Sequence, residues 1–587
     1  MSNIRNYTMV ALAMSVAIGC QKNEDSETPA PDNKKTTTPW TELTPATPIY
    51  DDPKSVANCN ADDVKFLREI AKMNGFEEDF KTDDPSQWKK EHLAIIWKKE
   101  TANGKDTYFV SELGGARGSG KGITKLDFFD VNNAFTKLEK VELTTPDLTT
   151  VYIDGSIPSL KAIILKGKDT EKTSTLEKIT IRNLEGLETL SLTDFPSLKT
   201  TNDEDYFAVS TYYYNGNLVN VTLNNIGASS IQISATKTLQ ELSLQNNLNV
   251  ETLNIEDATL TNLDFNASTY PKLTSLTLKK LTNNSAQSLN IEGLANLTDI
   301  NISKIPSVTK ASVSGCPKVT SLMIQNGNFT HITLQGLSEL KTIDLAGNKI
   351  ANIDISSFSK VTKVYLNDNE LKGATPFKLP TTVETLSLQG NEGLTAVDLS
   401  PYKELTLVNI NGYKKGATSA TTPSTLSYLK IAGLTKLERL LANWNALSTI
   451  DTDGQENISE KISLIECENN ELTPDAIYAL KKAFPSLDFS LSGAGSSSKS
   501  CSYVKQRAFK VGTITNNQVT FAISQDPNYG QQTQVSLKDT DSSVYQYDNS
   551  SGILSIKKAG SYEIIVKNDK LLGQIRNGFV SEKITVK

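Results

Sequence analysis

Histidine is almost absent from this chain of 587 residues, which contains only His92 and His331. Imidazole is the usual general base of enzymes and the commonest zinc ligand, and neither histidine belongs to a recognisable catalytic or metal-binding motif. Acidic residues are numerous, but no spacing singles out a pair that could work as acid and base. The sequence therefore predicts a protein that is not an enzyme, with no catalytic residue, no metal site and no cofactor.

An excess of positive charge is also missing, because 60 Lys and Arg residues stand against 67 Asp and Glu residues, giving a net charge of −7. Proteins that bind nucleic acid need basic residues to neutralise phosphates, so nucleic acid is excluded as a partner. Hydrophobic residues make up 38% of the chain, which is enough to build folded domains. The length exceeds the usual domain size of roughly 100–200 residues, which favours several domains or a repeat structure.

Cysteine is scarce as well, with five residues in the whole chain. Cys467 occupies an apolar position of a repeated pattern and Cys316 precedes a proline in a turn, so both are interpreted as small buried side chains or free thiols. No disulfide framework is expected.

The N-terminus begins with a short apolar run at residues 9–18, after Arg5 and before Cys20. The run is too short to span a bilayer and is typical of a cleaved signal. Residues 17–20, Ala-Ile-Gly-Cys, resemble a bacterial lipobox, which implies a signal peptide at 1–19 and a lipid on Cys20; an ordinary secretory signal is the alternative. Residues 21–25, Gln-Lys-Asn-Glu-Asp, resemble the surface-export signal of Bacteroidetes lipoproteins. This resemblance implies an outer membrane lipoprotein exposed at the cell surface.

Residues 20–58 are rich in Thr, Pro and charge and contain little that could be buried. Such a composition predicts a disordered tether, which would hold the folded part away from the lipid.

A repeated pattern dominates the chain from about residue 138 to residue 470: an apolar residue, two variable residues, an apolar residue, one variable residue and another apolar residue. Its period of about 21 residues and its alternation are typical of leucine-rich repeat strands. Several units continue into an asparagine, whose amide can bond the backbone where each strand ends. We expect a structural ladder formed by Asn348, Asn369, Asn391, Asn445 and Asn470.

These units resemble the leucine-rich repeats of Bacteroidetes cell-surface proteins, and residues 462–472 match closely, with Cys467 in the last inward position. The resemblance implies a mainly β fold, a solenoid over residues 123–490 that ends in a capping helix. Helical spacing at 62–74 and 85–97 predicts a helical N-terminal cap at 59–122. A Gly/Ser linker at 491–500 then leads to short strands at 501–587, which resemble a bacterial immunoglobulin-like β-sandwich.

A candidate binding face follows from the alternation where the repeat phase is clear, at residues 340–399. The outward positions there are Thr342, Asp344, Lys363, Tyr365, Asn367, Thr385, Ser387 and Gln389. Aromatic residues and arginine contribute disproportionately to binding, which suggests a second patch. Its members are Tyr428, Lys430, Arg439, Asn443 and Trp444; the alternative for Trp444 is packing inside its turn.

The predicted function is that of a lipid-anchored surface protein that uses its repeat face to bind an extracellular protein in adhesion or host interaction. The membrane is contacted only through the N-terminal lipid. The alternative is a glycan-binding lipoprotein, although glycan sites usually show aromatic platforms and the repeats hold one tryptophan with scattered tyrosines. Insertions near 202–214 and 411–424 interrupt the repeats, either as recognition loops or as tolerated insertions.

Overall fold

The computed structural model describes residues 52–114, 120–128, 134–155, 157–168, 172–202, 204–210, 218–234, 239–260, 262–282, 288–413, 424–490 and 499–587. The signal peptide, Cys20 and nearly all of the tether lie outside the described residues, as do residues 203 and 211–214 of the first predicted insertion and most of the second insertion and of the linker. Part of the first predicted insertion is instead a regular strand, β10 (Phe207–Ser210), which pairs in parallel with β12 (Ser230–Ser234). Residues 51–587 form one compact unit. In the described part of the chain, no helix is long and apolar enough to cross a membrane.

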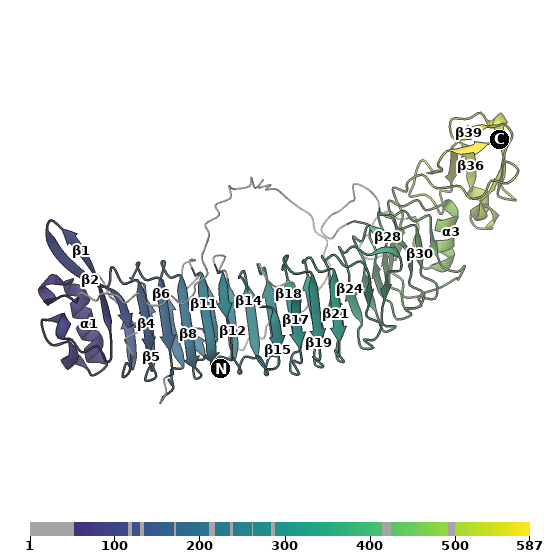
Figure 1. The fold of residues 1–587 in the computed structure, drawn as a ribbon. Coiled ribbons are helices and arrows are strands. Elements are labelled where there is room, and N and C mark those ends of the chain that lie inside the picture. The colour runs from purple at the N-terminus through teal and green to yellow at the C-terminus, as the bar shows by residue number, and fades with distance from the viewer. Residues whose placement is uncertain are drawn as a thin grey trace, which may run out of the picture. The chain divides into compact units, whose positions relative to one another are not determined.

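The N-terminal cap combines one helix with a β-hairpin (Figure 1). Helix α1 (Ala61–Met73) begins at Asn60, whose side chain accepts a hydrogen bond of 2.9 Å from the backbone N–H of Asp63. Short 3-10 turns follow at Glu77–Phe80 (η2) and Pro85–Gln87 (η3), after the first at Val56–Asn58 (η1).

The predicted second helix at residues 85–97 is wrong, because strand β1 (Ile95–Ala102) pairs there with β2 (Lys105–Gly114). Asn103 and Gly104 join the two strands with positive φ angles of 52° and 72°, the conformation that Asn-Gly hairpin turns require. This turn signal and the β-branched pair at the start of β1 outweigh the helical spacing.

Each coil of the solenoid contributes strands to two opposite faces. We call one the ladder face. It consists of a four-stranded and a thirteen-stranded parallel sheet, with strands β3 (Lys125–Phe128), β5 (Thr150–Asp154), β7 (Lys178–Arg182), β9 (Thr200–Thr201), β10 (Phe207–Ser210), β12 (Ser230–Ser234), β14 (Thr252–Glu256), β16 (Ser275–Lys279), β18 (Asp299–Ser303), β20 (Ser321–Gln325), β22 (Thr342–Asp344), β24 (Lys363–Tyr365), β27 (Thr385–Ser387), β29 (Leu407–Asn409), β31 (Arg439–Leu441), β33 (Leu464–Glu466) and β34 (Ser500–Ser502).

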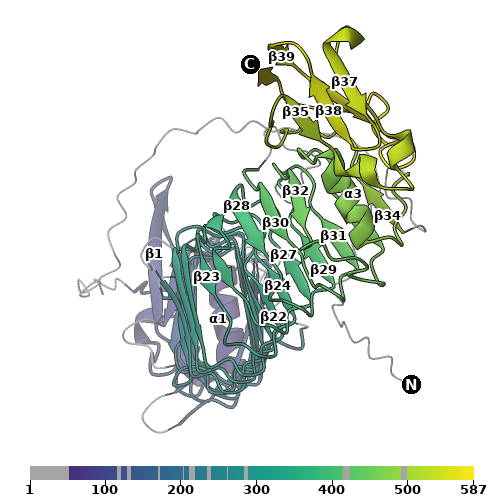
Figure 2. The same cartoon turned by 90° about the vertical axis from the view of Figure 1, so that its right-hand side faces the viewer.

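The other face, called the opposite face, carries the strands between them (Figure 2). After β1 and β2 these are β4 (Lys140–Thr144), β6 (Ala162–Lys166), β8 (Thr189–Phe195), β11 (Asn220–Ile226), β13 (Glu241–Ser243), β15 (Asp264–Asn266), β17 (Ser288–Glu292), β19 (Lys310–Ser314), β21 (His331–Gln335), β23 (Ile353–Asp354), β25 (Lys372–Ala374), β26 (Phe377–Lys378), β28 (Gly393–Asp398), β30 (Tyr428–Lys430) and β32 (Thr449–Asp451).

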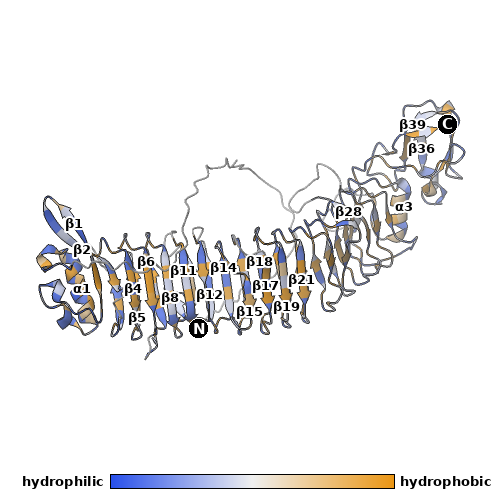
Figure 3. Ribbon diagram, in the orientation of Figure 1, coloured by the Kyte–Doolittle hydropathy of each residue, from blue (hydrophilic) through white to orange (hydrophobic). Residues whose placement is uncertain are grey.

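Alternating burial along the strands builds the core between the two faces. In β18, for example, Ile300 and Ile302 are buried while the residues beside them are partly or fully exposed. Parallel register stacks equivalent residues of neighbouring coils, so Ile300 lies beside Leu322. Figure 3 shows hydrophobic residues along the strands and hydrophilic residues in many of the turns. The fold is a mainly β, leucine-rich repeat solenoid.

Buried asparagines tie successive coils together where the ladder strands end. The Nδ2 of Asn369 donates to the carbonyls of Leu345 in the preceding coil and Leu366 in its own coil, at 2.9 and 3.2 Å, and its Oδ1 accepts from the N–H of Ile350. Paired donations of the same kind are made by Asn348, Asn391, Asn445 and Asn470.

Sequence analysis missed an equivalent asparagine on the opposite face, in the turn after β13. Asn247 is fully buried, donates to the carbonyl of Leu223 at 2.8 Å and accepts from the N–H of Ile226 at 3.0 Å. It lies in the earlier coils, where the repeat phase is irregular and the motif is hard to align.

The C-terminal end of the solenoid is closed by helix α3 (Pro474–Ala483), which the side chain of Thr473 caps by accepting from the N–H of Ala476. Strand β34 then pairs in parallel with β33, so residues 500–502 belong to the ladder rather than to the linker and the terminal module.

The rest of the chain forms three small antiparallel sheets, β35-β38-β37, β36-β40-β41 and β39-β42, together called the terminal module. The elements are β35 (Gln518–Thr520), η4 (Ala522–Gln525), η5 (Gly530–Gln532), β36 (Gln534–Leu537), η6 (Ser542–Val544), β37 (Tyr545–Asp548), β38 (Ile553–Ile556), β39 (Gly560–Tyr562), β40 (Ile564–Lys567), β41 (Phe579–Val580) and β42 (Ile584–Val586).

Candidate functional site

The ladder face between β22 and β34 brings together most residues of the first candidate set. Strand register places Thr342 beside Lys363 and Lys363 beside Thr385, which makes one row of outward side chains across the coils. Asp344, Tyr365 and Ser387 form a second row in the same way. Because neighbouring strands lie only about 4.8 Å apart, side chains within a row contact one another and form a continuous surface.

Three members of the set are far less accessible than outward positions suggest. Asn367, Ser387 and Gln389 expose only 5%, 5% and 8% of their surface. Asn409 of the next coil donates a hydrogen bond of 3.0 Å to the Oε1 of Gln389. The close strand spacing explains this burial, since each polar side chain is covered by its equivalents in the adjacent coils.

The second candidate set does not form one patch. Tyr428 and Lys430 lie on β30 of the opposite face, whereas Arg439 lies on β31 of the ladder face (Figure 2). On the opposite face, Tyr428 donates to the carboxylate of Asp451, and Lys430 pairs with Asp453 at 2.9 Å. Strands on both faces show a similar alternation of apolar and polar residues, so the sequence pattern did not show which strands lie on which face.

Trp444 lies in the turn after β31, where its φ angle is +59° and its side chain is partly buried. Its carbonyl accepts a hydrogen bond of 3.2 Å from the N–H of Ser424. A Cβ at Gly412 would lie 1.9 Å from that carbonyl oxygen, so only glycine allows this close approach of the two coils.

A hydrogen-bonded polar cluster occupies the ladder face around β31, β33 and β34. Asn443 donates to the Oε2 of Glu466 at 3.0 Å, and its Oδ1 accepts from the backbone N–H of Glu468 at 2.7 Å. Ser502 donates to the carboxylate of Glu468. Asn411 donates to the hydroxyl of Tyr413 at 3.2 Å. These bonds fix the polar side chains relative to one another.

Burial raises the pKa of Glu466 above its ordinary value, and the nearby charge of Glu468 acts in the same direction, against the hydrogen bond from Asn443. Burial also raises the pKa of Tyr413, with the charge of Glu466 as a further cause. Carboxylates in such an environment are stabilised by a cation brought by a partner.

The two histidines lie outside this surface. His92 stacks on Phe76 in the N-terminal cap, with ring centroids 4.9 Å apart, while His331 is exposed on β21 of the opposite face. In the part of the chain that the structure describes, no group of three His, Cys, Asp or Glu residues could hold a metal ion.

Among known proteins, the chain is similar only to solved structures. No protein-family model matches the chain, and no curated protein matches it. The functional domain of InlJ from Listeria monocytogenes is 16% identical, with a TM-score of 0.31 over 61% of this chain and 85% of that chain. YopM from Yersinia enterocolitica is 14% identical, with a TM-score of 0.28 over 60% and 88%. InlF, an internalin from Listeria monocytogenes, is 19% identical, with a TM-score of 0.25 over 47% and 76%.

Proposed function

We propose that this protein binds an extracellular protein through the ladder face between β22 and β34, in adhesion or host interaction. The observation that carries the proposal is the uninterrupted thirteen-stranded parallel sheet, whose outward side chains are joined by hydrogen bonds across successive coils. Seven neighbouring strands extend over about 29 Å at a spacing of about 4.8 Å. A surface of that length suits a macromolecule better than a small molecule.

The fixed polar side chains lower the entropy that binding would cost, because few of them must be ordered when a partner arrives. Tyr365 and Arg439 are the residue types that most often dominate protein interfaces, and both are partly exposed on this face. The cluster around Glu466 and Glu468 would accept a basic group of the partner.

The first experiment tests the segment from Asp51 to Lys587, which forms one compact unit, on an array of extracellular proteins and purified polysaccharides. A Tyr365→Ala, Arg439→Ala double variant should lose at least tenfold in affinity for a bound protein. The matched control is Tyr428→Ala, Lys430→Ala, which removes a tyrosine and a positively charged side chain from the opposite face. Equal loss in both variants, or binding of polysaccharides alone, would contradict the proposal, and the second result would favour glycan capture.

We further propose that the protein is a lipoprotein displayed on the outer membrane through Cys20, with residues 20–50 as the tether; residues 52–58, predicted as part of the tether, belong to the folded cap, where the N–H of Val56 donates to the carbonyl of Asp83 at 2.8 Å. The support is the resemblance of residues 17–25 to a lipobox followed by a surface-export signal. Cys20→Ala should abolish incorporation of an alkyne-labelled fatty acid. Protease added to intact cells should digest the wild-type chain, whereas a protected chain would contradict surface display.

A further inference from the structure

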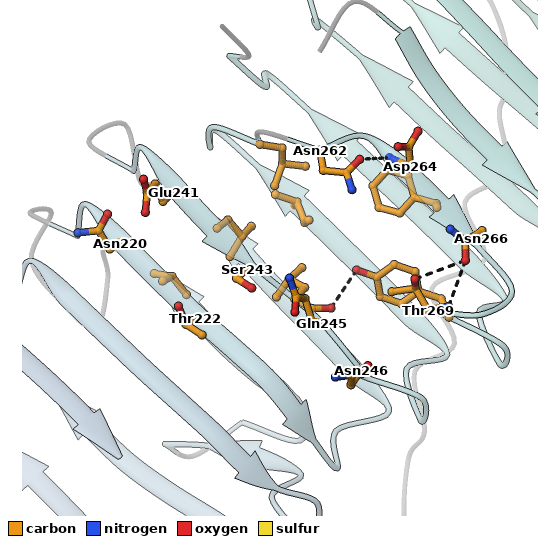
Figure 4. Close-up of a pocket in the computed structure, with 17 residues that line it drawn as sticks. Asn220, Thr222, Glu241, Ser243, Gln245, Asn246, Asn262, Asp264, Asn266 and Thr269 are labelled. Carbon is orange, nitrogen blue, oxygen red and sulfur yellow. Dashed lines mark hydrogen bonds between the residues drawn. The ribbon is translucent and has the colours of Figure 1, made fainter. Parts of the chain in front are cut away.

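The opposite face contains a cleft of about 590 Å³ between β13 and β15 (Figure 4). Among the described strands, β13 pairs with β11 alone and β15 pairs with β17 alone. On the ladder face, β14 and β16 of the same two coils pair over five residues. The two coils are therefore joined on one side and separated on the other, so two strand edges face each other across the cleft.

The separation opens a path to the apolar interior. Leu242 stands at an inward position of β13 but is only partly buried, whereas its registered neighbour Val221 in β11 is 1% exposed. Ile255 also lines the cleft, although it belongs to β14 on the far side of the core. β21, at the other end of the β15–β21 sheet, likewise leaves Ile332 and Leu334 partly exposed. Inward apolar side chains are thus partly exposed both at β13 and at β21, where a strand lacks a neighbour on one side.

The aromatic residues of the cleft offer no flat surface on which a sugar could stack. Phe265 and Tyr270 expose 4% and 5% of their surface, and their rings stack on each other with centroids 5.9 Å apart. The hydroxyl of Tyr270 donates to the carbonyl of Leu244 at 3.3 Å, which closes one side of the cleft (Figure 4). A glycan would lack the exposed ring that such sites normally provide.

The charge of the cleft is negative. Glu241 and Asp264 are exposed at the first positions of the two strands, and the Oδ1 of Asp264 accepts a hydrogen bond of 2.6 Å from Asn290. None of the described residues that line the cleft is Lys, Arg or His. A ligand that carries a cation would complement this end.

We propose that the cleft binds an extended peptide segment that adds as a strand to the edge of β13 or β15. The peptide backbone would supply the hydrogen bonds that these edges lack, and every second side chain would point to Leu242 and the apolar floor. A Lys or Arg of the peptide would lie near Glu241 and Asp264. Three residues on each strand span about 10 Å, so about three residues of the peptide would pair with one strand edge. This site lies on the face opposite the proposed protein-binding surface and does not depend on it.

The test pans a library of random dodecapeptides on phage against the chain from Gln21 to Lys587. Enriched peptides should alternate apolar and polar residues, contain Lys or Arg, and lack proline in the alternating segment. The strongest peptide is then synthesised with a fluorophore, together with a version in which its four central amides are N-methylated. N-methylation removes backbone donors and should lower the affinity at least tenfold.

Glu241→Lys should lower the affinity at least tenfold, and Leu242→Asn should lower it at least fivefold. Glu188→Lys makes the same charge change two coils away on the same face and should alter the affinity less than twofold. Bound peptide should also slow hydrogen exchange of the amides at residues 241–246 and 262–266. Since Glu241 is exposed, its substitution leaves the core unchanged even if Leu242→Asn destabilises the coil.

The proposal is overturned if no peptide is enriched, if the N-methylated peptide binds equally well, or if both cleft variants bind as tightly as the wild type. Sugar binding that the cleft variants abolish would likewise overturn it in favour of a glycan site. The Tyr365→Ala, Arg439→Ala variant should keep its peptide affinity, which separates failure of this site from failure of the ladder-face proposal.

Discussion

The phenolic oxygen of Tyr478 lies 2.6 Å from the Oδ2 of Asp526 and donates a hydrogen bond to it. This bond joins α3, which closes the solenoid, to the terminal module. One turn earlier in the helix, the carboxylate of Asp475 accepts the backbone N–H groups of Ala522 and Ile523 at 3.0 and 2.9 Å. Two side chains of the capping helix, Asp475 and Tyr478, therefore make hydrogen bonds to residues 522–526 of the terminal module.

Asp475→Ala should destabilise this junction. The substitution leaves two backbone N–H groups of η4 without their acceptor, which typically costs about 1–3 kcal/mol in the free energy of unfolding. Urea unfolding would measure the loss, and hydrogen exchange should be faster at residues 518–526 than elsewhere. Asp541→Ala is the control, because that carboxylate caps the exposed turn η6 within the module. Equal losses in the two variants would contradict a special role of Asp475.

Asn369→Ala should lower the free energy of unfolding by about 2–4 kcal/mol, because it leaves the buried N–H of Ile350 without its acceptor. It also removes one of the two hydrogen bonds to each of the carbonyls of Leu345 and Leu366, which keep their bonds from Asn348 and Asn391. Thermal and urea unfolding both measure this change. Asn328 also donates to a carbonyl, that of Pro306, but in an exposed setting, so Asn328→Ala should cost less than about 1 kcal/mol. If Asn369→Ala also lowered the free energy of unfolding by less than about 1 kcal/mol, the asparagine ladder would contribute little to stability.

Asp63 should make stability depend on pH in an unusual direction. Burial raises the pKa of Asp63 above its ordinary value, although its carboxylate accepts the N–H groups of Val110 and Phe135. A raised folded-state pKa means that the contribution of Asp63 is greatest below the ordinary value of 3.8 and is lost as the pH rises through the folded-state pKa. The difference in unfolding free energy between wild type and Asp63→Asn should therefore shift against the wild type as the pH rises from 3.5 to about 7.

Asp548 provides the opposite case. Hydrogen bonds from Ser551 and Ser550 lower its pKa to about 2, so its contribution is present above 3.8 and is lost as the pH falls towards 2. The wild type and Asp548→Asn should differ by a constant amount between about pH 5 and pH 7. If the difference in unfolding free energy from the wild type changed with pH in the same direction for Asp63→Asn and Asp548→Asn, the Asp63 effect could not be assigned to burial.

The thiols should be unreactive in the folded protein. The four cysteines in the described residues are buried and free, and burial raises the pKa of Cys59 to about 12. Burial also raises the pKa of Cys316 and Cys501, so few thiolates form near neutral pH. In the chain from Gln21 onward, Ellman's reagent at pH 8 should detect less than one thiol before urea is added and four afterwards. Rapid modification without urea would show that the coils open locally.

The sequence allowed the solenoid to be predicted because its signal is repeated many times, and each coil buries the same two inward positions of a strand. It did not allow assignment of Tyr428 and Arg439 to different faces, because both lie in strands with the same alternation. The hairpin at Asn103 was missed although its turn signal was present. The cleft beside Leu242 depends on which strands pair, and strand pairing is a property of neighbouring coils that no single repeat encodes.

The late position of β34 in the chain has a consequence for folding. Most contacts of the solenoid join coils about 20 to 35 residues apart in sequence, so coils can assemble one after another as the nascent chain lengthens. The edge of β33 stays open until residues 500–502 have been made, well after α3. A chain truncated after the capping helix would expose this edge to other copies, and we expect it to aggregate more readily than the complete chain.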